Sequence, residues 1–153
     1  MYKKELGEAL QEKPRPSVIS GVTERVRTAH GNMFVTINYD DDGRPFEVFA
    51  ILGKAGSTES AGLEAISRLT TMALRAGVDP GKIIEHLRGI TDEPVWDHGR
   101  LVRSAPDAVA LVLGRHLKRE WGVPTDGSDS VDRVSSVQLD LSFDEAKNIS
   151  DDK

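Results

Sequence analysis

The residues best suited to bind a ligand lie between positions 53 and 58, where a predicted strand gives way to a predicted helix. This stretch reads Gly53, Lys54, Ala55, Gly56, Ser57 and Thr58. Glycine-containing turns expose backbone N–H groups, and the helix start adds a partial positive charge beside Lys54, so the loop could hold a phosphate or a carboxylate. It is not a Walker A loop, because Val48 or Phe49 occupies the place of the first glycine. The plainer interpretation is a tight connection in which a hydroxyl residue caps the helix.

Histidine and carboxylate residues raise a second chemical possibility, a metal site. The chain has four histidines, which are His30, His86, His98 and His116. No two are spaced so that they share one helix face, so a solvated or structural role is the natural interpretation of each. The alternative is a metal-dependent enzyme built around His30, Asp92 and His98.

Charge and composition exclude several classes of function. The net charge of −5 comes from the C-terminal part, since residues 1–124 hold 17 acidic and 17 basic side chains and residues 125–153 hold 8 acidic and 3 basic. Nucleic-acid binding needs clustered Lys and Arg, so we expect none. No apolar run reaches the ~18 residues that a membrane span needs, and residues 2–13 are too charged for a signal peptide, so we expect a cytoplasmic protein without a membrane partner. The chain has no cysteine, which excludes disulfides, thiolate zinc sites, iron–sulfur clusters and thiyl radicals.

Three segments between residues 18 and 52 have the alternation and β-branched composition of strands. The first covers residues 18–28, the second 33–39 and the third 45–52, and Asp40 to Gly43 supply a strong turn signal. Only Glu47 interrupts the apolar third strand, so we expect that strand to be central. Strands joined by such short turns must run antiparallel.

Three helices are expected after the strands. The first covers residues 60–76, the second follows Asp79-Pro80 and closes at Gly89, and the third covers 106–121 with Ser104 and Asp107 at capping-box-like spacing. Residues 90–103 are expected to form a loop. The predicted buried residues are Phe34, Phe46 or Phe49, Leu63, Ile66, Leu69, Ile84 and Leu87.

These elements predict an α+β domain, in which a three-stranded antiparallel meander packs against about three helices. We assign a leader to residues 1–17, the folded domain to 18–122 and an acidic linker and tail to 123–153. In the tail, Val137, Leu139, Leu141 and Phe143 alternate with polar residues. Residues 134–143 could thus form an extra edge strand or pair with a partner, and a homo-oligomer through this segment is one outcome.

Several segments match one known family in order and spacing over about residues 15–117. They lie at residues 15–16, 20–28, 31–38, 42–50, 52–56, 63–69, 73–80, 87–90 and 104–110. Together they resemble the TSCPD-type domain, which forms the C-terminal region of one branch of adenosylcobalamin-dependent (class II) ribonucleotide reductases.

The departures from that family concern cysteine. The family name records a Thr-Ser-Cys-Pro-Asp string, and here alanine stands at Ala105 in place of its cysteine. Many relatives carry further cysteines where this chain has His30, Thr58 and Asp92. Four such cysteines would suit a metal site, and Thr58 and Ala105 cannot replace them, so the resemblance implies a lost site. We expect the four vestigial positions to lie together as a metal-free cluster.

The resemblance implies a non-catalytic accessory domain that associates with the catalytic chain of a class II ribonucleotide reductase in deoxyribonucleotide synthesis. The cysteines that carry the radical and the electrons in that reaction are absent, so we expect no catalysis by this chain alone. It would hold no cofactor, and adenosylcobalamin would belong only to a partner reductase. The alternative is a small anion- or nucleotide-binding protein that uses the loop from Gly53 to Thr58.

Overall fold

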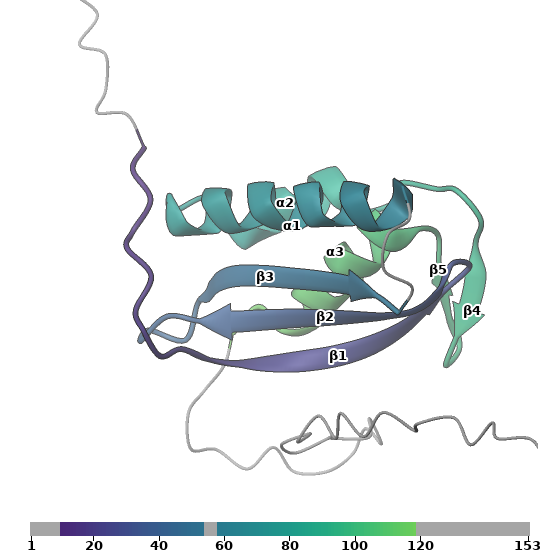
Figure 1. Cartoon of the computed structure of the whole chain (residues 1–153), viewed down its shortest axis with the longest axis horizontal. Coiled ribbons are helices and arrows are strands. Elements are labelled where there is room, and N and C mark those ends of the chain that lie inside the picture. The colour runs from purple at the N-terminus through teal and green to yellow at the C-terminus, as the bar shows by residue number, and fades with distance from the viewer. Residues whose placement is uncertain (1–9, 54–57, 119–153) are drawn as a thin grey trace, which may run out of the picture. The chain divides into compact units, whose positions relative to one another are not determined.

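The computed structural model describes residues 10–53 and 58–118. It confirms the α+β prediction, with a three-stranded antiparallel sheet, three helices and a small two-stranded hairpin (Figure 1). The elements are β1 (Ser20–Thr28), β2 (Gly31–Tyr39), β3 (Pro45–Leu52), α1 (Thr58–Arg75), α2 (Pro80–Leu87), β4 (Val95–Asp97), β5 (Arg100–Val102) and α3 (Ala105–Arg115). The tail, with its predicted strand over 134–143, lies outside the described residues.

The sheet is a meander with β2 at its centre. A two-residue turn joins β1 to β2, and the predicted Asp-Gly turn joins β2 to β3, where the Asp40 carboxylate accepts the amides of Asp42 and Arg44, each at 2.9 Å. The prediction that the third strand is central was wrong, because β3 forms an edge. α1 packs against this strand, where Val48, Ala50 and Leu52 are buried, whereas the alternate residues Phe49 and Ile51 are exposed.

α1 closes the β3 edge. The helix runs alongside β3 in Figure 1, and the Thr71 hydroxyl both accepts the Val48 amide (2.9 Å) and donates to the Val48 carbonyl (3.1 Å). The buried side chains of this helix are Leu63, Ser67, Thr70 and Leu74. Thr71 thus satisfies the outward backbone groups of Val48, which an open edge would leave free.

The core lies on one face of the sheet, which we call the inner face. Met33, Val35 and Ile37 of β2 are fully buried there, and α3 lies behind the sheet in Figure 1. α2 packs against α3 and completes this layer with the half-buried Ile84 and Leu87. No helix in the described ranges is long and apolar enough to cross a bilayer.

The opposite face, which we call the outer face, has no helix against it among the described elements, and this corrects part of the predicted core. Phe46 and Leu63 are buried as predicted, and Ile66 is half-buried. Phe34 is 43% exposed and Phe49 47% exposed, because alternation along β2 and β3 turns them away from the core. Leu69 is 61% exposed, since α1 turns its other face, with Leu63, Ser67, Thr70 and Leu74, toward the domain.

Two more predictions are corrected after residue 89. The expected loop over 90–103 contains the β4–β5 hairpin, whose turn residues His98 and Gly99 both have positive φ (43° and 77°), as a two-residue hairpin turn requires. The third helix ends at Arg115 and not near residue 121, because His116 leaves helical geometry. The His116 carbonyl accepts the Tyr39 hydroxyl at 2.8 Å. The predicted caps Asp79 and Ser104 are confirmed.

Candidate functional site

The predicted anion-binding loop is described only at its two ends. Lys54, Gly56 and Ser57 lie outside the described residues, and Thr58 is the first residue of α1. The Gly53 amide donates to the Asn32 carbonyl at 3.0 Å, so it joins the loop to the β1–β2 hairpin and is not free for a ligand. Anion binding by this loop stays a prediction.

Of the four vestigial positions expected to lie together, His30 and Asp92 are in direct contact in the structure. His30 Nε2 lies 3.3 Å from Asp92 Oδ2, which joins the β1–β2 turn to the segment after α2. The Asp92 amide donates to the Arg103 carbonyl at 3.0 Å, and the buried Ala105 follows two residues later. α1, which begins with Thr58, starts at this same end of the sheet (Figure 1).

The residues at these four positions do not suit a metal ion. Ala105 has no ligating atom, and no group of three or more His, Asp or Glu side chains gathers within residues 10–53 and 58–118. His98, the third ligand of the metal-enzyme hypothesis, is 87% exposed on the β4–β5 turn, and its Nε2 lies 3.8 Å from Asp97 Oδ1. The structure therefore brings His30 and Asp92 together without a third ligand.

Asp107 and Ser104 organise the start of α3. The fully buried Asp107 carboxylate accepts the amides of Gly89 (2.8 Å) and Arg103 (3.0 Å), and Ser104 Oγ accepts the Asp107 amide (3.1 Å) and donates to the Ile90 carbonyl (2.6 Å). Both side chains are occupied with backbone groups. They tie the segment after α2 to α3 and leave no free nucleophile or base there.

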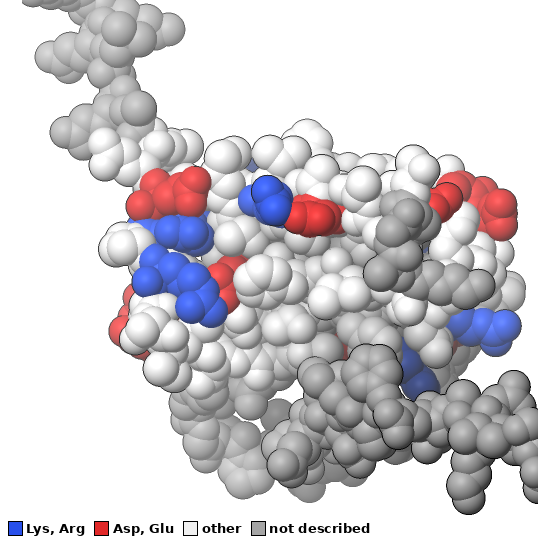
Figure 2. Space-filling view, viewed as in Figure 1, with Lys and Arg blue, Asp and Glu red and all other residues white. Residues whose placement is uncertain are grey.

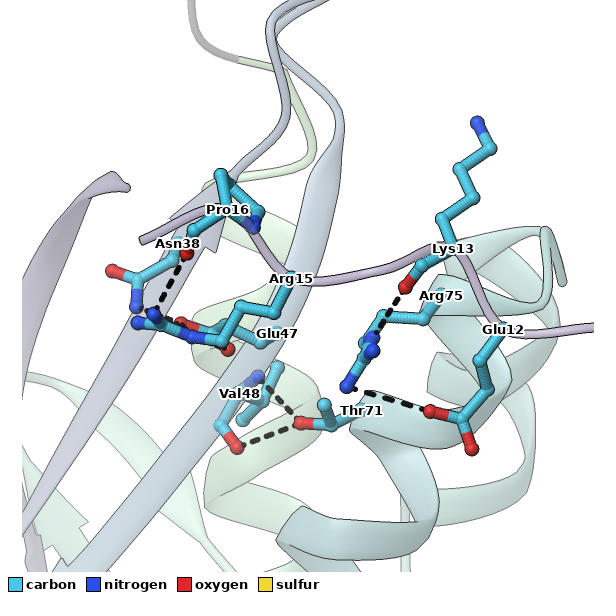
Figure 3. A network of polar contacts seen from close by, with 9 residues as sticks. All are labelled: Glu12, Lys13, Arg15, Pro16, Asn38, Glu47, Val48, Thr71 and Arg75. Carbon is cyan, nitrogen blue, oxygen red and sulfur yellow. Dashed lines mark hydrogen bonds and ion pairs between the residues drawn. The ribbon is translucent and has the colours of Figure 1, made fainter. Parts of the chain in front are cut away.

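A buried carboxylate on the outer face was missed by the sequence analysis as a site residue. Glu47 of β3 has a side chain only 2% exposed, and Arg15 covers it, donating from Nε (2.9 and 3.1 Å) and Nη2 (3.0 Å) (Figure 3). Asn38, its neighbour on β2, donates to the same carboxylate at 2.7 Å. Gly21 on β1 makes room for Asn38, because a Cβ at Gly21 would lie 2.0 Å from Asn38 Oδ1.

The ionisation of Glu47 follows from these contacts. Burial alone would raise the pKa of Glu47, but the hydrogen bonds from Arg15 and Asn38, with the charges of Arg15 and Arg75, outweigh burial and hold the pKa below its ordinary value. A carboxylate that stays ionised near neutral pH and is fully hydrogen-bonded is poorly suited to proton transfer. Glu47 thus anchors the chain segment that carries Arg15.

That segment, residues 10–18, is tied to α1 as well as to the sheet. The Lys13 amide donates to the Arg75 carbonyl at 3.0 Å, and Arg75 Nε donates to the Lys13 carbonyl at 2.9 Å (Figure 3). Arg75 also pairs with Glu12 (3.4 Å) and lies over the Phe46 ring, 5.7 Å from its centroid. We call residues 12–16 the strap. They belong to the predicted leader, and their contacts hold it against one end of the outer face.

Beyond the strap, the outer face carries an exposed apolar patch on β2 and β3. Phe34 pairs across the strands with Ile51, and Phe49 pairs with Thr36, so these side chains share one face and lie side by side. Ile51 is 65% exposed. Figure 2 shows this side of the molecule, where the visible centre is uncharged and charged side chains gather toward the margins. Such a patch on a small domain is typical of an interaction surface.

The edge of the sheet next to this patch is also open. Alternate residues of β1 direct their backbone groups toward β2, and the other set, Gly21, Thr23, Arg25 and Arg27, directs them outward. The outward direction is visible at Arg27, whose amide donates to Asp97 Oδ2 of the hairpin at 3.2 Å. The backbone groups of Gly21, Thr23 and Arg25 on this edge have no partner in the part of the chain that the structure describes.

Comparison with known proteins places most of the chain in one family. Residues 2–117 match the model of the TSCPD domain, a range that includes the strap, the whole described sheet and the three helices. No curated protein and no solved structure matches the chain.

Proposed function

The chain belongs to the TSCPD domain family, and we propose that it is a cytoplasmic, non-catalytic accessory domain that binds the catalytic chain of a class II ribonucleotide reductase. The chain would then take part in deoxyribonucleotide synthesis but would itself catalyse no step. Adenosylcobalamin would be held by the partner alone.

The chemistry of the chain supports a binding role over a catalytic one. It has no cysteine, so it cannot supply the thiyl radical or the electron-carrying pair of a reductase. The three best-buried polar residues of the described ranges are Glu47, Ser104 and Asp107, and the side chains of all three are engaged in contacts within the domain. These side chains are therefore not free to take part in catalysis, which favours a role in binding another protein.

The observation that carries the proposal is the open outer face. Phe34, Phe49 and Ile51 expose large apolar side chains side by side, on a sheet whose other face is covered by helices. Burial of such side chains contributes ~25 cal/mol per Å² of apolar surface, and aromatic residues often dominate the energy of a protein interface. Their exposure is explained if a partner covers them.

A pull-down and a turnover assay test this proposal. The purified chain should bind the catalytic chain of the class II reductase of the same organism and alter its turnover. The double variant Phe34→Ser/Phe49→Ser should weaken binding by about tenfold or more, since each tenfold is only about 1.4 kcal/mol. Ile90→Ser, which removes an exposed apolar residue from outside the sheet, is the matched control. Absence of binding by the wild-type chain would refute the proposal.

A further inference from the structure

We propose that the open edge of β1 receives an extended strand of the partner protein, and that this strand carries a carboxylate on the outer face of the sheet and an apolar side chain on the inner face. The inference rests on the proposed function, because the partner is taken to be the reductase catalytic chain. It goes further by locating the contact on β1 and by stating the chemistry of the segment that binds there.

Backbone hydrogen bonding defines the length of the site. Gly21, Thr23 and Arg25 each offer an outward N–H and C=O, which together pair with about five residues of an added strand. The Arg27 amide already donates to the Asp97 carboxylate, so the site ends before Arg27. The other edge of the sheet is covered by α1, whose Thr71 already bonds both outward backbone groups of Val48. Within the described sheet, strand addition is therefore directed to β1.

Charge indicates what the added strand carries on the outer face. Arg25 and Arg27 are exposed, and neither guanidinium has an ion-pair partner among residues 10–53 and 58–118. An added strand lies ~4.8 Å from β1, so a side chain on this face would lie opposite Arg25, with Arg27 just beyond the end of the site. A carboxylate at that position would form a cross-strand pair with Arg25, and one in the residues that follow could approach Arg27.

Apolar positions on the added strand follow from the same alternation. On the inner face of the site, β1 offers Val22, which is only half-buried at the open edge, and Glu24, whose carboxylate is already engaged by Arg115 and His116. The partner residue beside Val22 should therefore be apolar. Beyond the strand, the outer face continues into Phe34, which pairs across the sheet with Arg25. The segment that follows the added strand can cover this apolar patch.

Exposed aromatic residues on a sheet can also stack nucleic-acid bases, but the observations favour a protein. Ile51, opposite Phe34 in the patch, has an aliphatic side chain that offers no ring for stacking. Residues 1–124 carry equal numbers of acidic and basic side chains, so phosphate attraction would be weak.

The test compares variants of the full chain for binding to the catalytic chain by calorimetry. Thr23→Pro removes one outward amide without removing a β1–β2 hydrogen bond, and proline is tolerated on such an edge. Thr23→Val keeps that amide and is the matched control. We expect Thr23→Pro to weaken binding by about tenfold and Thr23→Val by less than about twofold.

A second pair of variants tests the charge and does not depend on proline. Arg25→Glu should weaken binding by about tenfold and reduce its dependence on salt, whereas Arg88→Glu, an exposed arginine on α2's C-terminal cap, should leave binding unchanged. Thermal melting of each variant checks that the domain still folds.

The outcomes separate the inference from the proposed function. Full binding by both Thr23→Pro and Arg25→Glu would overturn the inference and leave the proposed function standing. Absence of binding by the wild-type chain would overturn both. A single-stranded oligonucleotide that binds the wild-type chain, displaces the catalytic chain and requires Phe34 would show that this face binds nucleic acid, and would also overturn the inference.

Discussion

Removing Arg15 should release the strap and destabilise the domain. Arg15→Ala deletes the guanidinium that covers Glu47, with its hydrogen bonds of 2.9–3.1 Å. The Glu47 carboxylate, only 2% exposed, then keeps the bond from Asn38 but loses those from Arg15, and a buried acceptor left without its partner costs about 1–3 kcal/mol. We therefore expect a total loss of about 2 kcal/mol in the free energy of unfolding, which is a fall of ~8 °C in Tm for a domain of this size.

The pH dependence of this loss identifies Glu47 as its source. The pKa of Glu47 is lower in the folded chain than its ordinary value, so the stability it contributes is present above the unfolded pKa, about 4.3, and is lost as the pH falls through the folded pKa. The difference in Tm between wild type and Arg15→Ala should be full near neutral pH and should shrink below about pH 4.

Thermal melting followed by circular dichroism measures both quantities. Arg25→Ala is the matched control, because that exposed arginine has no ion-pair partner among the described residues, and it should shift stability by less than about 0.5 kcal/mol. If Arg15→Ala had the same Tm as the wild type, or if the difference in Tm persisted unchanged in acid, the conclusion that the Arg15–Glu47 contact stabilises the domain would be refuted.

Three further outcomes follow from buried polar groups and from the cluster around His30. Ser67 Oγ is buried and has no hydrogen-bond partner among the described residues, so Ser67→Ala should raise the free energy of unfolding by about 1 kcal/mol in urea titrations; a loss of that size would contradict this. Asp107→Ala strands the amides of Gly89 and Arg103 and should cost about 3 kcal/mol in the same titration, whereas an unchanged midpoint would show that these amides find other partners. Chelator should leave the Tm of the wild-type chain unchanged, and a fall of several degrees would reveal a bound metal.

The strands and helix caps were predictable because they depend on local chemistry. The Asp-Gly turn, the cap at Asp79 and the cap at Ser104 each involve residues within a few positions of one another. The antiparallel order followed from turns too short for any other connection. The β4–β5 hairpin was missed because its strands are three residues long and its turn uses His98 in a conformation that favours glycine.

The faces of the elements were less predictable because they depend on which side the helices cover. Alternation in β2 separates Phe34 from Met33, but both are apolar, and only the packing of α3 decides which is buried. Leu69 fitted an apolar helical stripe, yet α1 contacts β3 through the hydroxyl of Thr71, a hydrogen bond that hydrophobic periodicity does not report.

The Arg15–Glu47 pair joins residues 32 positions apart, so no local spacing predicts it. A signal was nevertheless present. Glu47 is the single charged residue in the apolar strand over 45–52, and a carboxylate at such a position needs a partner when it is buried. The meeting of His30 and Asp92, by contrast, was predicted from the family resemblance and is seen in the structure.

Hydrogen exchange of backbone amides tests most directly whether the open edge of β1 binds the proposed partner. The full chain would be measured alone and with the class II reductase catalytic chain. The outward amides of Thr23 and Arg25 have no partner among the described residues, so they should exchange rapidly in the free chain and become protected in the complex, while α2 amides remain unchanged. Protection confined to α2, or no protection of β1 in a complex that has formed, would contradict the account.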